Sequence, residues 1–326
     1  MDPHLRSMAA ADGAFSVKAA RERDIRRSAW DSAHLLRPFR GTRLVPDESD
    51  PRAVGVYEAE RREALRRIVA LSKVLPPGTF VAGASAALLW GLPVPRTELA
   101  TTHTGVVFPR TPTRRPGVLG RRFSPGMVVV TQHRGVPVLD VASTWASLGA
   151  RLRVDDLVAA ADAALLQPRN HGGFHPEALR PALATLEELR AVVDRGRFRG
   201  APRLRTALGL AREGSCSPPE TFLRLRLGEA GLPEPRLNFD IEDSGAWIAC
   251  GDVVFPEYRV CVEYQGAHHR TAAQYSSDLD RSQRLRGLGW VVVELAAAHV
   301  LTNPQIGVGR VEAALRSRGW RDERWR

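Results

Sequence analysis

Residues 246–265 read AWIACGDVVFPEYRVCVEYQ, and this stretch decides the fold of the last third of the chain. Two runs rich in β-branched and aromatic residues flank the turn Pro256–Tyr258, which is the pattern of two adjacent strands. Pairing that is symmetric about this turn places apolar residues opposite each other, for example Val254 opposite Cys261. We therefore predict an antiparallel pair with this register.

The same register brings two acids together. Asp252 lies opposite Glu263, and because side chains alternate along a strand, both carboxylates share one face of the sheet with Gln265. Like charges directly opposite each other are destabilising, and a divalent cation between them removes that conflict. We predict that Asp252 and Glu263 hold Mg²⁺ or Mn²⁺. The alternative is a slipped register, or a Glu263 side chain that points to solvent.

The elements around this pair predict a small α/β domain with a mixed sheet flanked by helices. A helix is expected to begin at Ser217-Pro-Pro-Glu220, because Ser is a good cap and Pro suits the first turn, and to continue to Ala230. The other expected elements are strands Arg236–Ile241, Ala246–Phe255 and Arg259–Tyr264, a polar helix Ala272–Leu288, a buried strand Trp290–Leu295 and a closing helix Pro304–Arg318.

The acidic pattern carries a family resemblance. Asp252…Glu263-Tyr-Gln265-Gly266…His269, followed by Asp278-x-x-Arg281 and Gly289-Trp290, resembles the PD-(D/E)xK nuclease superfamily, and in particular its very-short-patch-repair (Vsr)-like branch. The resemblance covers about residues 200–326. It implies a restriction-endonuclease-like fold and magnesium-dependent hydrolysis of phosphodiester bonds, with Asp252 and Glu263 as metal ligands.

Further roles follow from the same resemblance. It implies that Glu220 is a supporting acid, that Gln265 stands where the family has Lys, and that His269 lies near the phosphate as acid, base or orienting donor. Ser217-Pro-Pro-Glu220 is also a capping box, so both roles of Glu220 stay open. His268 is the alternative to His269. Arg281 either approaches a phosphate or forms a solvated ion pair with Asp278.

Two departures from the family pattern bear on activity. Gln265 can position a water molecule but cannot carry the charge of Lys, and the chain has no Lys after Lys73. Gly251, rather than Pro, precedes Asp252.

The N-terminal part predicts a DNA-binding module. Two short helices, Ser16–Glu22 and Arg26–Leu35, precede a basic ribbon at Arg37–Val45, which is the outline of a winged helix-turn-helix. With Ala86-Ala-Leu-Leu-Trp-Gly-Leu-Pro-Val-Pro95, this part resembles DNA-binding antitoxins of the AbiEi type, which implies a winged helix joined to a mixed α/β region. A solvated structural subdomain is the alternative. The predicted DNA-binding residues are Arg26, Arg27, Arg37, Arg40, Arg43 and Arg281.

Charge supports a polyanionic partner. The chain has a formal net charge of +11, with 33 basic and 21 acidic residues before Cys216 but 14 arginines and 15 acidic residues from Cys216 onward. Phosphates attract such a basic surface, although a general preference for Arg over Lys explains part of the charge. The three cysteines form no Cys-x-x-Cys pair. We expect neither disulfides nor a zinc site, no membrane association, and a cytoplasmic, nucleoid-associated protein.

We expect five segments: a flexible tail (1–14), a winged helix-turn-helix (15–48), a mixed α/β middle domain (49–175), a helical connector (176–214) broken at Gly196–Gly200, and the nuclease domain (215–326). In the middle domain, Ser85, His103 and His133 are scattered, and we interpret each as an ordinary loop or surface residue.

Two functions compete. The first is a metal-dependent DNA endonuclease. The second is a DNA-binding transcriptional regulator or antitoxin with a degenerate, inactive nuclease fold, which Gln265 in place of Lys favours. Action on RNA or mismatched DNA stays open.

Overall fold

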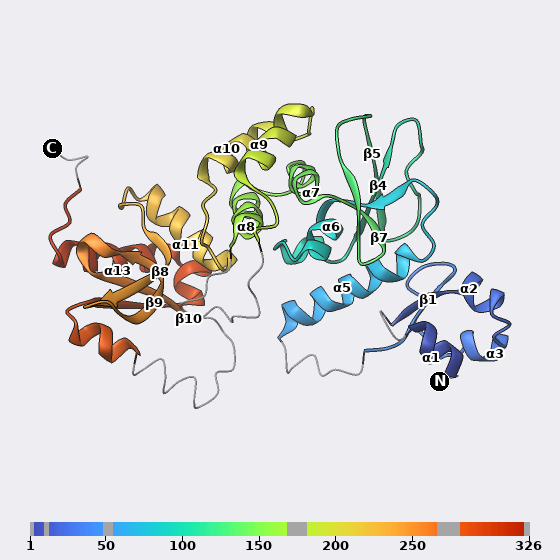
Figure 1. Cartoon of the computed structure of the whole chain (residues 1–326), viewed down its shortest axis with the longest axis horizontal. Coiled ribbons are helices and arrows are strands. Elements are labelled where there is room, and N and C mark those ends of the chain that lie inside the picture. The colour runs from blue at the N-terminus through green and yellow to red at the C-terminus, as the bar shows by residue number, and fades with distance from the viewer. Residues whose placement is uncertain (1–2, 10–12, 48–54, 168–180, 266–280, 323–326) are drawn as a thin grey trace. The chain divides into compact units, whose positions relative to one another are not determined.

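The computed structural model describes residues 3–9, 13–47, 55–167, 181–265 and 281–322, and the chain has mixed α/β structure (Figure 1). It forms two compact units, the first comprising Met1–Arg153 with Glu187–Arg205 and the second Val154–Leu186 with Thr206–Arg326. This division differs from the expected boundaries because the segment Glu187–Arg205 belongs to the first unit. In the part that the structure describes, no helix is long and apolar enough to cross a bilayer.

The first unit begins with a small helical module. Its elements are α1 (Pro3–Ala9), β1 (Ala14–Ser16), α2 (Val17–Glu22), α3 (Arg27–Trp30) and β2 (Thr42–Leu44). Ser16 caps α2, because its hydroxyl accepts the Ala19 N–H at 3.0 Å. β1 pairs antiparallel with β2. A separate β-bridge joins Leu36 to Leu44 and closes the ribbon formed by the residues between these two leucines.

Two expectations about this module were wrong. The predicted tail contains helix α1, whose Leu5 is fully buried in a cluster with Phe15 and Trp30, because an apolar residue near the terminus gains by joining the nearest core. The second predicted helix ends at Trp30 rather than Leu35. Its C-cap is Asp31. The Asp31 carboxylate forms ion pairs with Arg37 and Arg43 of the following ribbon.

A five-stranded mixed sheet follows in the same unit, with the strand order β5-β4-β3-β7-β6. β4 pairs with β5 in parallel and with β3 antiparallel, so β5 is an outer strand. The strands are β3 (Thr79–Val81), β4 (Thr102–Val107), β5 (Val118–Phe123), β6 (Val130–His133) and β7 (Val136–Leu139). The helical elements are α5 (Val56–Ser72), α6 (Gly83–Trp90), η1 (Arg96–Glu98), α7 (Val141–Leu148) and α9 (Leu186–Arg195).

The second unit contains the four-stranded sheet predicted from residues 246–265, with the order β11-β10-β9-β8. Its strands are β8 (Arg236–Asp243), β9 (Ala246–Phe255), β10 (Val260–Gln265) and β11 (Val291–Ala296). β8, β9 and β10 pair antiparallel, and β11 runs parallel to β10. A parallel pair requires a crossover connection between its two strands. The helical elements are α8 (Val154–Leu165), α11 (Pro218–Glu229), η3 (Pro256–Tyr258), η4 (Ala298–Thr302) and α13 (Pro304–Ser317), and α10 (Ala201–Leu210) spans the division between the units.

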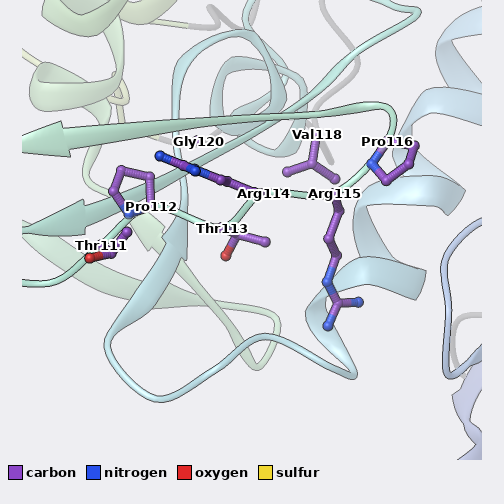
Figure 2. A pocket seen from close by; sticks show the side chains of 8 residues that line it. All are labelled: Thr111, Pro112, Thr113, Arg114, Arg115, Pro116, Val118 and Gly120. Carbon is purple, nitrogen blue, oxygen red and sulfur yellow. The ribbon is translucent and has the colours of Figure 1, made fainter.

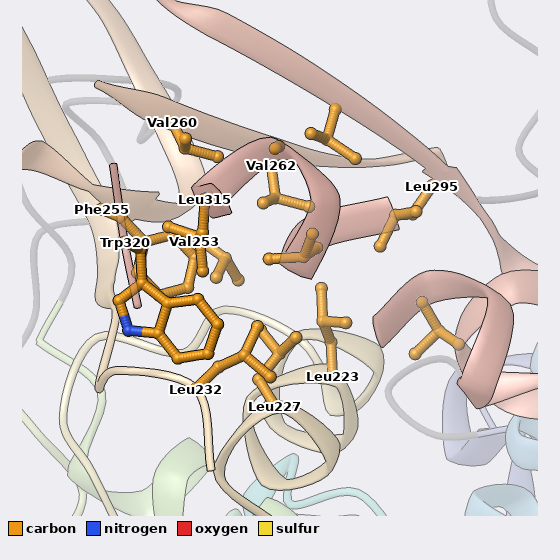
Figure 3. Packing of buried hydrophobic residues seen from close by; sticks show 14 residues of the cluster. Leu223, Leu227, Leu232, Val253, Phe255, Val260, Val262, Leu295, Leu315 and Trp320 are labelled. Atoms are coloured by element: carbon orange, nitrogen blue, oxygen red, sulfur yellow. The ribbon is translucent and has the colours of Figure 1, made fainter. Parts of the chain in front are cut away.

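Helices cover both faces of this sheet. Val253 and Val262 pack on one face with Leu223 of α11 and Leu315 of α13 (Figure 3). Val254 and Cys261 point to the opposite face and pack with Leu285, which lies in the helical segment 281–287. The described ends of the elements agree with the predicted ends to within two residues for β8, β9, β10, β11, α11 and α13.

Candidate functional site

The predicted strand register is confirmed between β9 and β10. Val254 pairs with Cys261 and Val253 with Val262, so the symmetric pairing about the turn is correct. The paired residues end at Val253 and Val262, and Asp252 and Glu263 are the next residues on the two strands. Because Val254 and Cys261 share a cluster with Leu285, the two acids lie on the face that the helical segment 281–287 covers.

The Asp252 side chain binds the main chain of β10 at the point where the pairing of β9 with β10 ends. Its Oδ2 accepts the Tyr264 N–H at 2.7 Å, and the side chain is half-buried. A carboxylate held by a main-chain donor at this point is fixed in position by the sheet itself. The strand therefore presents Asp252 in one orientation toward the acids around it.

Glu263 is buried, with 5% of the residue exposed. Its Oε2 accepts a hydrogen bond from Arg281 Nη2 at 2.8 Å, and the Cys261 thiol donates a weak one to Oε1 at 3.6 Å. Burial raises the pKa of Cys261 well above its usual value, and the negative charges of Glu263 and Asp252 raise it further. The thiol is thus a protonated neighbour of the two acids and does not supply a thiolate.

Glu220 takes part in the N-terminal cap of α11, the first of the two roles that the sequence left open. Ser217 caps α11 by accepting the Glu220 N–H at 3.4 Å, and its hydroxyl donates to Glu220 Oε1 at 2.7 Å. The Cys216 N–H donates to Oε2 at 2.9 Å. Burial raises the pKa of Glu220, and the negative charge of Asp252 raises it further. Glu220 therefore caps its helix and lies within electrostatic reach of Asp252.

Asn238 on β8 is a site residue that the sequence reasoning missed. Leu237 pairs with Val253 and Phe239 with Gly251, which places Asn238 opposite Asp252. Its Nδ2 donates to Glu220 Oε2 at 2.8 Å and to Gly214 O at 2.7 Å. The signal in the sequence is an Asn within an otherwise strand-forming run, since Asn disfavours strands and tolerates the φ of 43° that it adopts here.

The other predicted residues of this site divide into two groups. Gln265 ends β10 on the same face as Glu263, and Arg281 contacts Glu263 directly rather than lying on a solvated helix face. His269 lies outside the described residues, as do its alternative His268 and the expected partner Asp278. Among the described residues, Arg281 is thus the predicted residue that contacts one of the two acids directly.

Two carboxylates offer oxygen atoms at this end of the sheet. Asp252 and Glu263 offer carboxylate oxygens on adjacent strands, and Mg²⁺ needs only one or two carboxylates when water and phosphate oxygens complete its shell. Burial raises the pKa of Glu220 most, and the negative charge of Asp252 raises it further. No group of three or more His, Cys, Asp or Glu residues with metal-binding geometry is present among the described residues.

The predicted DNA-binding arginines of the first unit are not equivalent. Arg26 and Arg40 are exposed, whereas Arg27 and Arg37 form ion pairs with Asp31 at 3.5 and 3.2 Å. Arg43 is buried. Its guanidinium donates to Trp30 O, Thr42 O and the Asp31 carboxylate at 2.8, 2.9 and 2.6 Å, so it joins the ribbon to the helices.

The interpretation of Ser85 and His103 as loop or surface residues was wrong. Both are buried, because β4 carries His103 under helix α6, where the Ser85 hydroxyl accepts the His103 N–H at 2.8 Å. His103 Nδ1 accepts the Ala84 N–H at 3.3 Å, and its Nε2 lies 3.6 Å from the buried Glu98 carboxylate. Burial lowers the pKa of His103 to about 4. Arg151 binds Glu98 through Nε at 2.8 Å.

His133, the third residue of that set, is partly exposed on β6, and its ring lies 4.4 Å from that of Trp90.

Comparisons with known proteins leave the family open. No protein-family model matches the chain, and no solved structure matches it. Two uncharacterized proteins, from two strains of Mycobacterium tuberculosis, are each 26% identical to it over 271 residues, which cover 80% of this chain and 89% of each relative. The chain is thus similar over most of its length to mycobacterial proteins whose names state no activity.

Proposed function

We propose that the protein is a metal-dependent DNA endonuclease whose second unit hydrolyses phosphodiester bonds. The observation that carries this proposal is the pair of acids, Asp252 and Glu263, at the end of the pairing between β9 and β10, with the buried Glu220 of α11 within electrostatic reach of Asp252. The helix-three strands-helix-strand order, with one parallel pair at β10 and β11, supports a restriction-endonuclease-like fold.

Each residue has a distinct task in this proposal. Asp252 and Glu263 would hold Mg²⁺ or Mn²⁺, which supplies charge neutralisation at the phosphate and a more acidic water. Glu220, with its raised pKa, would accept a proton or orient water beside Asp252. Arg281, which contacts Glu263, would bind a phosphate oxygen and supply the positive charge that Gln265 lacks. Gln265 would orient water by hydrogen bonding.

The test is cleavage of supercoiled plasmid with Mg²⁺ or Mn²⁺, comparing the wild type with Asp252→Asn. Asp243→Asn is the matched control, since Asp243 is exposed at the far end of β8 and its replacement changes the charge equally. We expect nicking or cutting by the wild type and the control and none by Asp252→Asn. Equal cleavage by wild type and Asp252→Asn would refute the assignment.

Binding of the metal is tested separately by calorimetric titration of Mg²⁺ or Mn²⁺ into the wild type and Glu263→Gln. Glutamine keeps the shape of the side chain and one oxygen but removes the charge. We expect saturable binding by the wild type and at least a tenfold weaker affinity in the variant, roughly as the loss of a ligand carboxylate implies.

A second candidate function is a DNA-binding regulator or antitoxin in which the nuclease fold is inactive. The contact between Arg281 and Glu263 favours it, because a guanidinium already neutralises one predicted metal ligand. It predicts salt-dependent DNA binding with no cleavage under any divalent metal and no calorimetric signal from Mg²⁺.

A further inference from the structure

A second concentration of positive charge lies away from the predicted DNA-binding residues. Between Glu98 and Asp140 the chain contains six arginines and no acidic residue. Most of them fall on the connection between β4 and β5 and on β5 itself, the outer strand of the five-stranded sheet. Such a run has no acidic partner within its own sequence and therefore favours a phosphate-bearing ligand.

Residues 111–116 of this connection fold against β5 and form a groove of about 630 Å³ together with Val118 and Gly120 (Figure 2). Gly120 makes the close approach possible. A Cβ atom at this position would lie 2.7 Å from Thr113 O and 2.8 Å from the Pro112 side chain. Any other residue there would push the connection off the strand and open the groove.

Proline residues and a hydrogen-bonded turn restrict the backbone of the groove. Pro112 and Pro116 each fix one backbone angle, and the turn that follows closes with a hydrogen bond from Val118 N to Arg115 O at 3.1 Å. Gly117 in this turn has a φ of 72°, which a glycine adopts without strain. A ligand that binds here would therefore cost little ordering of the loop.

The side chains that line the groove offer hydrogen-bond donors that suit phosphate oxygens. Arg114 is exposed and Arg115 is half-buried, and their guanidinium groups point in different directions (Figure 2). Thr111 and Thr113 add hydroxyl groups. No acidic side chain lines the described groove, and neither does an aromatic ring or an amide side chain that could recognise a base. Guanidinium and hydroxyl groups without base-recognising partners are typical of contacts to a phosphodiester backbone.

The groove is continuous with the helical module at the start of the chain. Arg115 Nη1 donates to Arg40 O at 3.3 Å, so the groove borders the ribbon that carries Arg40. Arg40 is exposed and belongs to the predicted DNA-binding set. The groove and the ribbon that carries Arg40 could therefore contact the phosphodiester backbone of the same duplex.

We propose that the groove formed by residues 111–116, Val118 and Gly120 binds backbone phosphates of duplex DNA and holds the duplex in a fixed register relative to the module at the N-terminus. This role rests on the DNA-binding part of the proposed function and extends it. Arg114 and Arg115 thereby acquire a positioning role that is independent of base sequence.

The test is the salt dependence of binding to a labelled duplex of arbitrary sequence, measured by fluorescence anisotropy in EDTA so that no cleavage occurs. The duplex is about 30 base pairs long, which is roughly three helical turns. The wild type is compared with Arg114→Gln/Arg115→Gln. The matched control is Arg61→Gln/Arg62→Gln on α5, which removes the same charge from two arginines that are ion-paired with Glu58 at 3.2 and 3.5 Å.

Loss of two phosphate contacts should reduce the slope of log affinity against log salt by about 2, equally for duplexes of different sequence, while the control keeps the wild-type slope. If circular dichroism shows that the double variant is unfolded, the single variant Arg114→Gln at the exposed position is measured instead. Its slope of log affinity against log salt should be reduced by about 1. An unchanged slope in the folded groove variant overturns the proposal, as does displacement of the duplex by an equimolar mononucleotide.

Because binding in EDTA does not depend on Asp252 or Glu263, failure of this inference is distinguishable from failure of the endonuclease assignment.

Discussion

Both units bury charged side chains, but they arrange them differently. In the first unit, Glu98 is bound by Arg151 and faces His103, whose pKa of about 4 keeps it neutral, so positive and negative charge match. In the second unit, three described carboxylates, Glu220, Asp252 and Glu263, gather with one described guanidinium. Buried charge alone therefore indicates nothing about function. The comparison directs attention to the acidic end of the second unit's sheet, where we propose that a divalent cation binds.

The largest expected effect separates stability from activity at the acidic end of the sheet. Asp252→Asn keeps an oxygen that can accept the Tyr264 N–H but removes a negative charge beside Glu220. We expect cleavage to fall about a thousand-fold, because a metal ligand supplies several kcal/mol of transition-state stabilisation. Thermal stability without metal should rise slightly, because a like-charge repulsion is lost. Plasmid cleavage and calorimetric melting measure the two effects.

The same kind of substitution in the first unit should act in the opposite direction. Glu98→Gln leaves Arg151 without its carboxylate next to a buried histidine, and we expect a loss of about 2 kcal/mol in the free energy of unfolding. Urea unfolding followed by tryptophan fluorescence measures it. Glu60→Gln, which breaks the exposed pair with Arg96, is the matched control and should change stability little. A stabilising Glu98→Gln would show that the contrast between the units is mistaken.

On the proposed function, a divalent metal should stabilise only the second unit, which carries Asp252 and Glu263. At roughly ten times its dissociation constant, Mg²⁺ should add about 1.4 kcal/mol to the free energy of unfolding of the second unit. Glu263→Gln should abolish this shift, whereas Glu98→Gln should preserve it. Hydrogen exchange with and without Mg²⁺ locates the effect, and protection confined to the five-stranded sheet would contradict the assignment.

The smallest effect is a difference in pH response. His103 has a pKa of about 4 in the folded protein and about 6.5 when unfolded, so the unfolded state binds more protons between these values. Between about pH 7 and 6, at the upper edge of this range, stability should therefore fall by less than about 1 kcal/mol as the pH is lowered. For Glu220 the sign is reversed. Its pKa is raised on folding, so protonation at low pH favours the folded state.

Melting curves of the wild type and His103→Gln across this range measure the first contribution, with the exposed His34→Gln as control. A His103→Gln variant that keeps the wild-type pH dependence would show that His103 does not carry it.

Local patterns made much of the second unit predictable. The apolar matches about Pro256–Tyr258 permit one register, and Ser217-Pro-Pro-Glu220 marks the start of α11. The contacts that complete the site depend on packing between distant segments. Asn238 reaches Glu220 only because β8 pairs with β9.

The same limit explains other contacts that were not foreseen. Arg281 reaches Glu263 only because its helical segment covers that face of the sheet. The buried pair of Asp162 and Arg224, 2.9 Å apart, joins α8 to α11 between segments far apart in the sequence, and no local spacing indicates it. In the first unit, His103 was misplaced because the start of β4 is set by its pairing with β5.

Gly251 has a consequence for anyone who would redesign this site. A Cβ atom there would lie 2.5 Å from the Cys261 sulfur and 2.6 Å from the Val254 side chain. The substitution Gly251→Pro would therefore drive a ring into that sulfur and displace the strand that carries Asp252. The close approach of the Cys261 thiol leaves room only for glycine at this position, so a redesign of the site must leave Gly251 unchanged.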